Sequence, residues 1–188
     1  MIKNNKACLG YFFKIKPTGM KLLLSLFIFS LSLSLKAQDQ VIPTFLEKWE
    51  NSKTYLLKIA QAMPSEQYDY KPTPREMSFR EQLQHIQQNM DWLRSSYLQQ
   101  DEQIEKNSSL ENEKEQLIAE LSNAFDALST ALSKIPASEL TTKVDFFAGE
   151  KTKLQILNLL QDHVTHHRGQ LIVYLNLNQI IPPKYIGW

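Results

Sequence analysis

The residues with the clearest chemical potential are the four histidines, His85, His163, His166 and His167. His163 and His167 are four residues apart, a spacing that places both imidazoles on one face of a helix, about 6 Å apart. A helix offers two nitrogens to one metal ion in this way. His85 lies in a second helical segment, in a context that can face the same interior. Three neutral imidazoles suit Zn²⁺, Ni²⁺ or another borderline divalent ion, and they leave a coordination position open for water or a small-molecule substrate.

The same spacing has a purely structural interpretation. An i,i+4 histidine pair occurs by chance on many helices, and an interior imidazole more often forms hydrogen bonds than binds a metal. His166 is offset from the face that the other two histidines of its segment share, so it is left out of the ligand set. Gln170 and Asn89 each lie one turn from a histidine and either orient an imidazole or face solvent. No residue stands out as a general base, and the catalytic residues are unknown.

Three further residues near the histidines have predicted structural roles. Trp92 lies seven residues after His85 and is a candidate for the wall of a pocket, although a tryptophan at helical spacing is usually a core residue. Gly169 within a helix costs about 1 kcal/mol relative to alanine, which suggests close helix packing beside the site. Arg168 is expected to serve structure, although it is also a candidate partner for an anion or a carboxylate on another helix.

Four long helical segments must position the histidines. They span about 43–63, 78 to the polar loop at 101–107, 110–135 and 153–179. In the second, the apolar residues step by 3, 4, 3 and 4, as one face of a helix requires: Leu83, Ile86, Met90, Leu93 and Tyr97. Ser78 with Glu81, and Thr152 with Gln155, are capping boxes that start the second and fourth segments. The stripe of the first segment has a polar gap near Ser52.

These patterns predict an all-α protein, a four-helix bundle of the up-down type with a long connector before the fourth helix. Residues 138–150 form this connector, expected as a loop with an extended piece. The tail after residue 180 contains two consecutive prolines, Pro182 and Pro183, and cannot continue a helix.

The N-terminal part differs in composition from the rest of the chain. Residues 1–37 contain six basic residues and no acidic one, and residues 22–35 form an uncharged run rich in leucine. Fourteen helical residues span about 21 Å, less than the roughly 30 Å hydrocarbon core of a bilayer. We interpret residues 1–37 as a signal peptide, with 1–19 an upstream start-site artefact if Met20 is the true start. Residues 38–188 are then the mature domain, periplasmic or secreted, with no stable membrane insertion after cleavage. An uncleaved membrane anchor is the alternative.

Removing the leader changes the charge balance. The whole chain has 21 basic and 20 acidic residues, and subtracting the six basic residues of 1–37 leaves 15 against 20, a net charge of −5. An acidic domain argues against nucleic acid as a partner. The only cysteine, Cys8, lies in the leader. Thiol catalysis and disulfides are therefore excluded for residues 38–188.

The ordered combination of these motifs resembles the DinB family, also called the DinB/YfiT-like metalloenzymes. Residues 163–170 match the family's HxxxHRGQ signature, and residues 78–86 are similar to its S-F-x-E-x-L-x-H-I segment. The Pro-Thr-Pro connector at 72–74 and the proline-rich end at 182–188 also resemble family features. The match covers nearly all of 42–188.

The resemblance implies a four-helix bundle that holds a divalent metal on His85, His163 and His167. It also implies a homodimer, and an activity such as the transferase or isomerase reactions of relatives that use low-molecular-weight thiols. The signal peptide departs from the family's usual cytoplasmic setting, where such thiols are kept reduced. The sequence therefore favours a metal-dependent hydrolase or transferase, with a non-catalytic metal- or ligand-binding bundle as the alternative.

Overall fold

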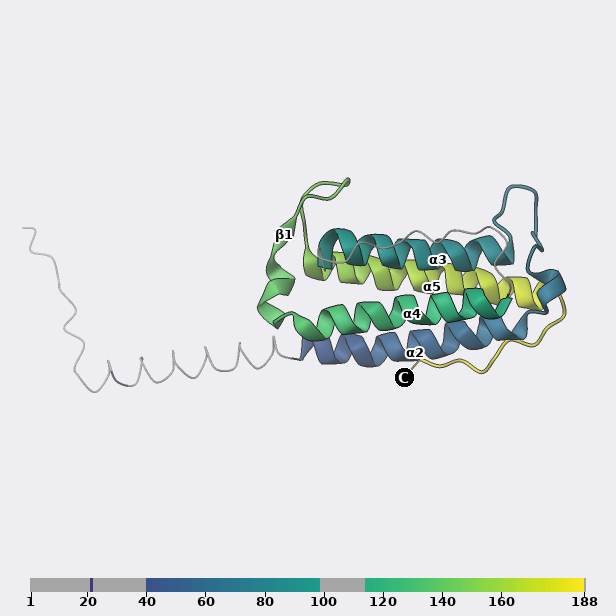
Figure 1. Cartoon of the computed structure of the whole chain (residues 1–188), viewed down its shortest axis with the longest axis horizontal. Coiled ribbons are helices and arrows are strands. Elements are labelled where there is room, and N and C mark those ends of the chain that lie inside the picture. Colours follow the sequence, from purple (N-terminus) through teal and green to yellow (C-terminus); the bar gives the residue numbers. More distant parts are fainter. Residues whose placement is uncertain (1–20, 22–39, 99–113, 188) are drawn as a thin grey trace, which may run out of the picture. The chain divides into compact units, whose positions relative to one another are not determined.

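A computed structural model describes residues 21, 40–98 and 114–187 of the chain. All described residues except Lys21 belong to one compact unit, residues 39–188. The predicted leader and its cleavage site lie outside the described residues, apart from Lys21. In the compact unit, four long helices run side by side: α2 (Val41–Ala62), α3 (Phe79–Leu93), α4 (Lys114–Lys134) and α5 (Lys153–Leu177) (Figure 1). The predicted four-helix bundle is confirmed.

The helices form a ring in which α2 and α3 each pack against both α4 and α5. Lys114, at the start of α4, donates to the carbonyl oxygens of Gln61 and Met63 at the end of α2, so these two helices are antiparallel. The start of α3 also lies near the end of α2, because Tyr68 bonds both to the Ala60 carbonyl oxygen and to the Arg80 amide. The helices α3 and α4 therefore run in the same direction, and the bundle departs here from the alternating order of the predicted up-down type. The 15 residues 99–113 join them, and such a segment reaches up to about 50 Å when extended, further than the roughly 32 Å length of α4.

Apolar side chains from all four helices fill the interior. Every residue of the predicted α3 stripe is buried except Tyr97, which is partly buried. On α2 the predicted polar gap is also part of the buried face, because Ser52 is only 2% exposed. Its small side chain continues the stripe of Trp49 and Leu56 without a large apolar group. The Trp49 indole nitrogen donates to the Phe125 carbonyl oxygen at 3.2 Å and so ties α2 to α4.

Both predicted capping boxes are present. The Ser78 hydroxyl accepts a hydrogen bond from the Glu81 amide at 3.1 Å, and the Glu81 carboxylate accepts one from the Ser78 amide at 2.6 Å. Thr152 and Gln155 form the same reciprocal pair at the start of α5. These bonds satisfy amide groups that have no partner within the helix, and they fix where α3 and α5 begin.

Replacing Ser78 with alanine is expected to lower the free energy of unfolding by about 1 kcal/mol, because the first turn of α3 loses its side-chain cap. Equilibrium urea unfolding measures this loss. Ser133→Ala is the matched control, since Ser133 is exposed near the end of α4 and bonds only to its own helix. Equal losses in both variants would contradict the assigned role of the cap.

The segments between the helices contain short regular elements that sequence patterns did not resolve. A 3₁₀ turn, η1 (Ser65–Gln67), follows α2, and a π-helical turn, η2 (Arg94–Leu98), continues α3. Before α5 come η3 (Ala137–Thr141) and an antiparallel hairpin of β1 (Lys143–Val144) and β2 (Lys151–Thr152), which provides the expected extended piece. None of the described helices combines the length and the apolarity needed to cross a bilayer.

Candidate metal centre

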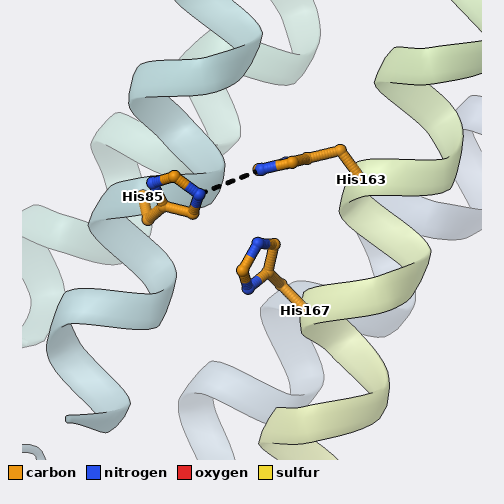
Figure 2. A group of neighbouring side chains, drawn as sticks. All are labelled: His85, His163 and His167. Atoms are coloured by element: carbon orange, nitrogen blue, oxygen red, sulfur yellow. Dashed lines mark hydrogen bonds between the residues drawn. The ribbon is translucent and has the colours of Figure 1, made fainter. Parts of the chain in front are cut away.

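Three histidines from two helices meet on one side of the bundle. His85 projects from α3, and His163 and His167 project from successive turns of α5 into the same space (Figure 2). One ring nitrogen of each lies within 4.8 Å of the others, and the Nε2 atoms of His85 and His163 are 3.0 Å apart. The structure therefore brings together all three residues that the sequence analysis selected.

This separation suits a shared cation. Zinc binds imidazole nitrogens at about 2.0–2.1 Å, so two nitrogens on one ion lie roughly 3–3.5 Å apart. The His85–His163 pair already has nearly this spacing, at 3.0 Å. All three nitrogens lie within 4.8 Å of one another. Among the described residues, this group contains no carboxylate.

Burial keeps the imidazoles of His163 and His167 neutral. His167 is buried, and His85 and His163 are partly buried. Burial, followed by the neighbouring histidines, lowers the pKa of His163 to about 4, and the same two causes lower the pKa of His167 to about 4. A neutral imidazole is the form that coordinates a metal. Both rings of α5 are therefore in the coordinating form well below neutral pH.

These shifts predict a pH dependence of stability for the metal-free protein. In the unfolded chain the two imidazoles protonate near their ordinary pKa of 6.5, whereas in the folded protein they protonate near 4. Between these values the unfolded chain binds more protons, so the free energy of unfolding falls as pH falls from about 6.5 to about 4. Above 6.5 both states are neutral and the contribution is constant. Urea titrations across this range are expected to show a shallower pH slope for His163→Gln than for the wild type, and identical slopes would contradict the assignment.

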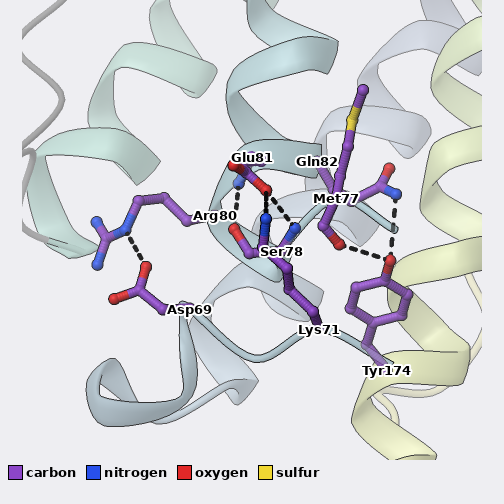
Figure 3. Close-up of polar contacts among 8 residues, drawn as sticks. All are labelled: Asp69, Lys71, Met77, Ser78, Arg80, Glu81, Gln82 and Tyr174. Carbon is purple, nitrogen blue, oxygen red and sulfur yellow. Dashed lines mark hydrogen bonds and ion pairs between the residues drawn. The ribbon is translucent and has the colours of Figure 1, made fainter. Parts of the chain in front are cut away.

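A glutamine that the sequence analysis did not select holds the orientation of His167. Gln82 is 2% exposed, and its side-chain oxygen contacts Nδ1 of His167. The Gln82 amide group donates to the Tyr174 hydroxyl at 3.4 Å, and that hydroxyl donates to the Met77 carbonyl oxygen at 2.8 Å (Figure 3). Because the amide oxygen can only accept, the proton of His167 is on Nδ1 and the Nε2 lone pair is left for a metal. The sequence signal for this role is weak: Gln82 lies one turn before His85.

The other polar residues near the cluster differ in their hydrogen bonds and burial. The Gln170 amide bonds to His166 at 3.0 Å, so its hydrogen bond in the described structure goes to a histidine outside the cluster. His166 lies outside the cluster, as expected. The Asn89 side-chain oxygen is buried without a hydrogen-bond partner in the described structure, so this oxygen does not face solvent. His163 Nδ1 also lacks a partner there.

Structural roles were predicted for three residues near the histidines, and only Arg168 has the predicted role. Arg168 is 6% exposed and its guanidinium lies 5.3 Å from the centre of the Tyr55 ring, a packing contact between α5 and α2. Trp92 is 41% exposed and contacts the aromatic rings of the β1–β2 hairpin, so the core prediction is wrong. Gly169 is also exposed, and a Cβ atom there would meet nothing within 4 Å. The expected close packing at Gly169 is therefore absent.

The sequence of this chain matches one known family. The sequence model of the DinB family matches residues 34–178 of this chain. The chain belongs to the DinB family. A search among curated proteins finds no match.

Two solved structures have a similar fold to this DinB-family chain. A DinB-like protein from Bacillus subtilis superposes with a TM-score of 0.64 at 19% identity, covering 77% of this chain and 99% of that protein. A DinB-like protein from Bacillus cereus gives a TM-score of 0.64 at 22% identity, with 74% and 93% coverage. At such low identity the similarity supports only the bundle fold. The functional residues must be inferred from the structure of this chain itself.

Proposed function

We propose that this DinB-family protein binds one divalent metal ion through His85, His163 and His167 and uses it in hydrolysis or group transfer on a small molecule. The observation that carries the proposal is the convergence of three imidazoles from two helices, within 4.8 Å of one another. The buried amide of Gln82, aimed at His167, adds the kind of outer hydrogen bond that metal-binding histidines usually have.

The donor set favours Zn²⁺ or Ni²⁺, because imidazole nitrogens suit borderline ions. Three protein ligands are typical of catalytic rather than structural zinc sites. A metal bound there supplies Lewis acidity and lowers the pKa of bound water. The chain itself supplies the neutral imidazoles, the fixed orientation of His167 and a half-buried setting that limits access of bulk water.

Elemental analysis of the purified protein tests the metal site. After growth with added Zn²⁺ and Ni²⁺, about one metal ion per chain is expected. Metal-free wild-type protein under these conditions would contradict the proposal. A native mass measurement on the same sample gives the oligomeric state, for which we propose a homodimer.

We further propose that the mature domain, residues 38–188, acts in the periplasm or outside the cell. The basis is the basic leader with its short apolar run at 22–35. Cell fractionation followed by mass measurement of the purified protein is expected to find a chain that begins at residue 38. A cytoplasmic protein that retains its leader would contradict this location and would restore the thiol-dependent reactions of relatives to consideration.

A non-catalytic role is the second candidate, and one observation favours it. Within the described residues, no carboxylate belongs to the histidine cluster, so an acid–base partner for a metal-bound water is not evident. Ester, amide and thiol-conjugate panels separate the two functions. Turnover that is lost in His85→Ala supports the enzyme, whereas metal-loaded protein without turnover on any panel supports a binding module.

A further inference from the structure

A shallow hollow lies beside the histidine cluster, against the outer side of α3. Its volume is about 430 Å³, within the range of small-molecule sites, and His85 forms part of its wall. The remaining wall comes from α3 and from the connector before it: Lys71, Pro74, Arg75, Glu76, Met77, Glu81, Gln84 and Gln88. A molecule in this hollow therefore contacts a histidine of the cluster and the connector together.

The connector that forms one wall is held in place at several points. The Phe79 and Arg80 amides donate to the carbonyl oxygens of Tyr70 and Tyr68 at 3.1 and 2.8 Å. The Tyr174 hydroxyl of α5 donates to the Met77 carbonyl oxygen (Figure 3). Since Tyr174 also accepts from Gln82, the same network orients His167 and fixes this wall. The hollow is thus a built feature of the site rather than a gap beside a loose loop.

The charges around the hollow are of two kinds. Lys71 and Glu81 neutralise each other in an ion pair of 2.9 Å. Arg75 and Glu76 are exposed, and neither side chain has a hydrogen bond or an ion pair within the described part of the chain. Gln84 and Gln88 add neutral amides on successive turns of α3. The hollow therefore presents one available cation and one available anion, with no net charge.

We propose that this hollow binds a small zwitterionic substrate, with its carboxylate on Arg75 and its ammonium group on Glu76, while its reacting group reaches the metal at His85. The inference rests on the proposed metal function and names the substrate class of that site. Arg75 matches the planar geometry of a carboxylate. A phosphate monoester fits less well, because the unpaired carboxylate of Glu76 would repel its second negative charge. Amino-acid-like molecules have the required pair of charges.

Four hydroxamates with the same metal-binding group test the proposal on the Co²⁺-loaded protein. Propionohydroxamate has no charged group other than the metal-binding group. Succinate monohydroxamate adds a carboxylate, and β-alanine hydroxamate adds an ammonium group. Aspartate β-hydroxamate adds both. Changes in the visible Co²⁺ absorption report binding. Each added charge is expected to tighten binding about 3- to 10-fold, as for a partly exposed charge pair, and the zwitterion is expected to bind most tightly.

Two variants test which side chain binds each charged group of the ligand. Arg75→Gln is expected to remove the advantage of the carboxylate, and Glu76→Gln that of the ammonium group, while propionohydroxamate binding stays unchanged in both. Lys134→Gln, an exposed position at the end of α4, is the control. Co²⁺-loaded protein that binds all four hydroxamates equally, or a preference that survives both variants, would overturn the zwitterion site alone. Failure of Co²⁺ to bind would overturn the metal function and this site together.

Discussion

Replacing His163 with alanine is expected to lower the affinity for Zn²⁺ or Ni²⁺ by about 100-fold or more. Loss of a residue that only orients a metal ligand typically costs about 10–100-fold, and loss of a ligand itself exceeds this. The fold is expected to survive, because the ring of His163 bonds only to His85 within the cluster, and its Nδ1 has no hydrogen-bond partner in the described structure. The substitution therefore separates metal binding from stability.

Competition with a chelator of known affinity measures the change. Thermal unfolding gives a second readout: at a metal concentration 100 times the wild-type Kd, binding stabilises the wild type by about 2.7 kcal/mol, and a 100-fold weaker variant by only about 0.4 kcal/mol. His166→Ala is the matched control, since His166 lies on the same helix, is exposed and bonds to Gln170. A His163→Ala protein that retains wild-type affinity, or a His166→Ala protein that loses as much, would contradict the proposed ligand set.

The sequence was most informative where the interactions are local. The apolar spacing of α3 and the capping pairs at Ser78 and Thr152 depend on residues three or four positions apart, and the structure confirms both capping boxes. The grouping of His163 with His167 is local in the same sense. The placement of His85 opposite them needed the bundle as well, because that contact joins residues far apart in the chain.

The missed features depend on contacts between elements. Gln82 looks like any polar residue in a helix until α5 places His167 and Tyr174 beside it. Trp92 has the spacing of a core residue, yet the hairpin before α5 offers its ring a partner near the surface. Ser52 looks like a break in a stripe, although small side chains are readily buried where helices pack closely. In each case the neighbour on another element decides the role.

The direction of the helices explains why the cluster forms at all. Because α5 is antiparallel to α3, Tyr174 lies beside Gln82 near the start of α3, and His163 lies beside His85 one turn further along. The capping box at Ser78 fixes where α3 begins and hence which residues face α5. A shift of one residue in that start would rotate the Gln82 and His85 side chains by about 100°. The local start signal of one helix thus sets the geometry of a site shared by two.

Replacing Gln82 with leucine is expected to weaken metal binding about 10–100-fold, although Gln82 is not a ligand. The change removes the acceptor for His167 Nδ1, so the ring is no longer held with its Nε2 lone pair toward the other two histidines. Gln82→Glu keeps an acceptor at this position and is expected to retain or increase the affinity. A merely structural role would predict similar losses for both variants.

Chelator competition with Zn²⁺ and the visible spectrum of the Co²⁺-loaded protein are the two measurements for Gln82. The spectrum reports the geometry of the ligands around Co²⁺. A general loss of stability does not change this geometry in the molecules that remain folded. Gln87→Leu is the matched control, because Gln87 is a partly buried residue of the same helix without a hydrogen bond from its side chain in the described structure. Wild-type affinity and spectrum in Gln82→Leu would show that His167 needs no orienting partner, and the tautomer inferred from this contact would then be wrong.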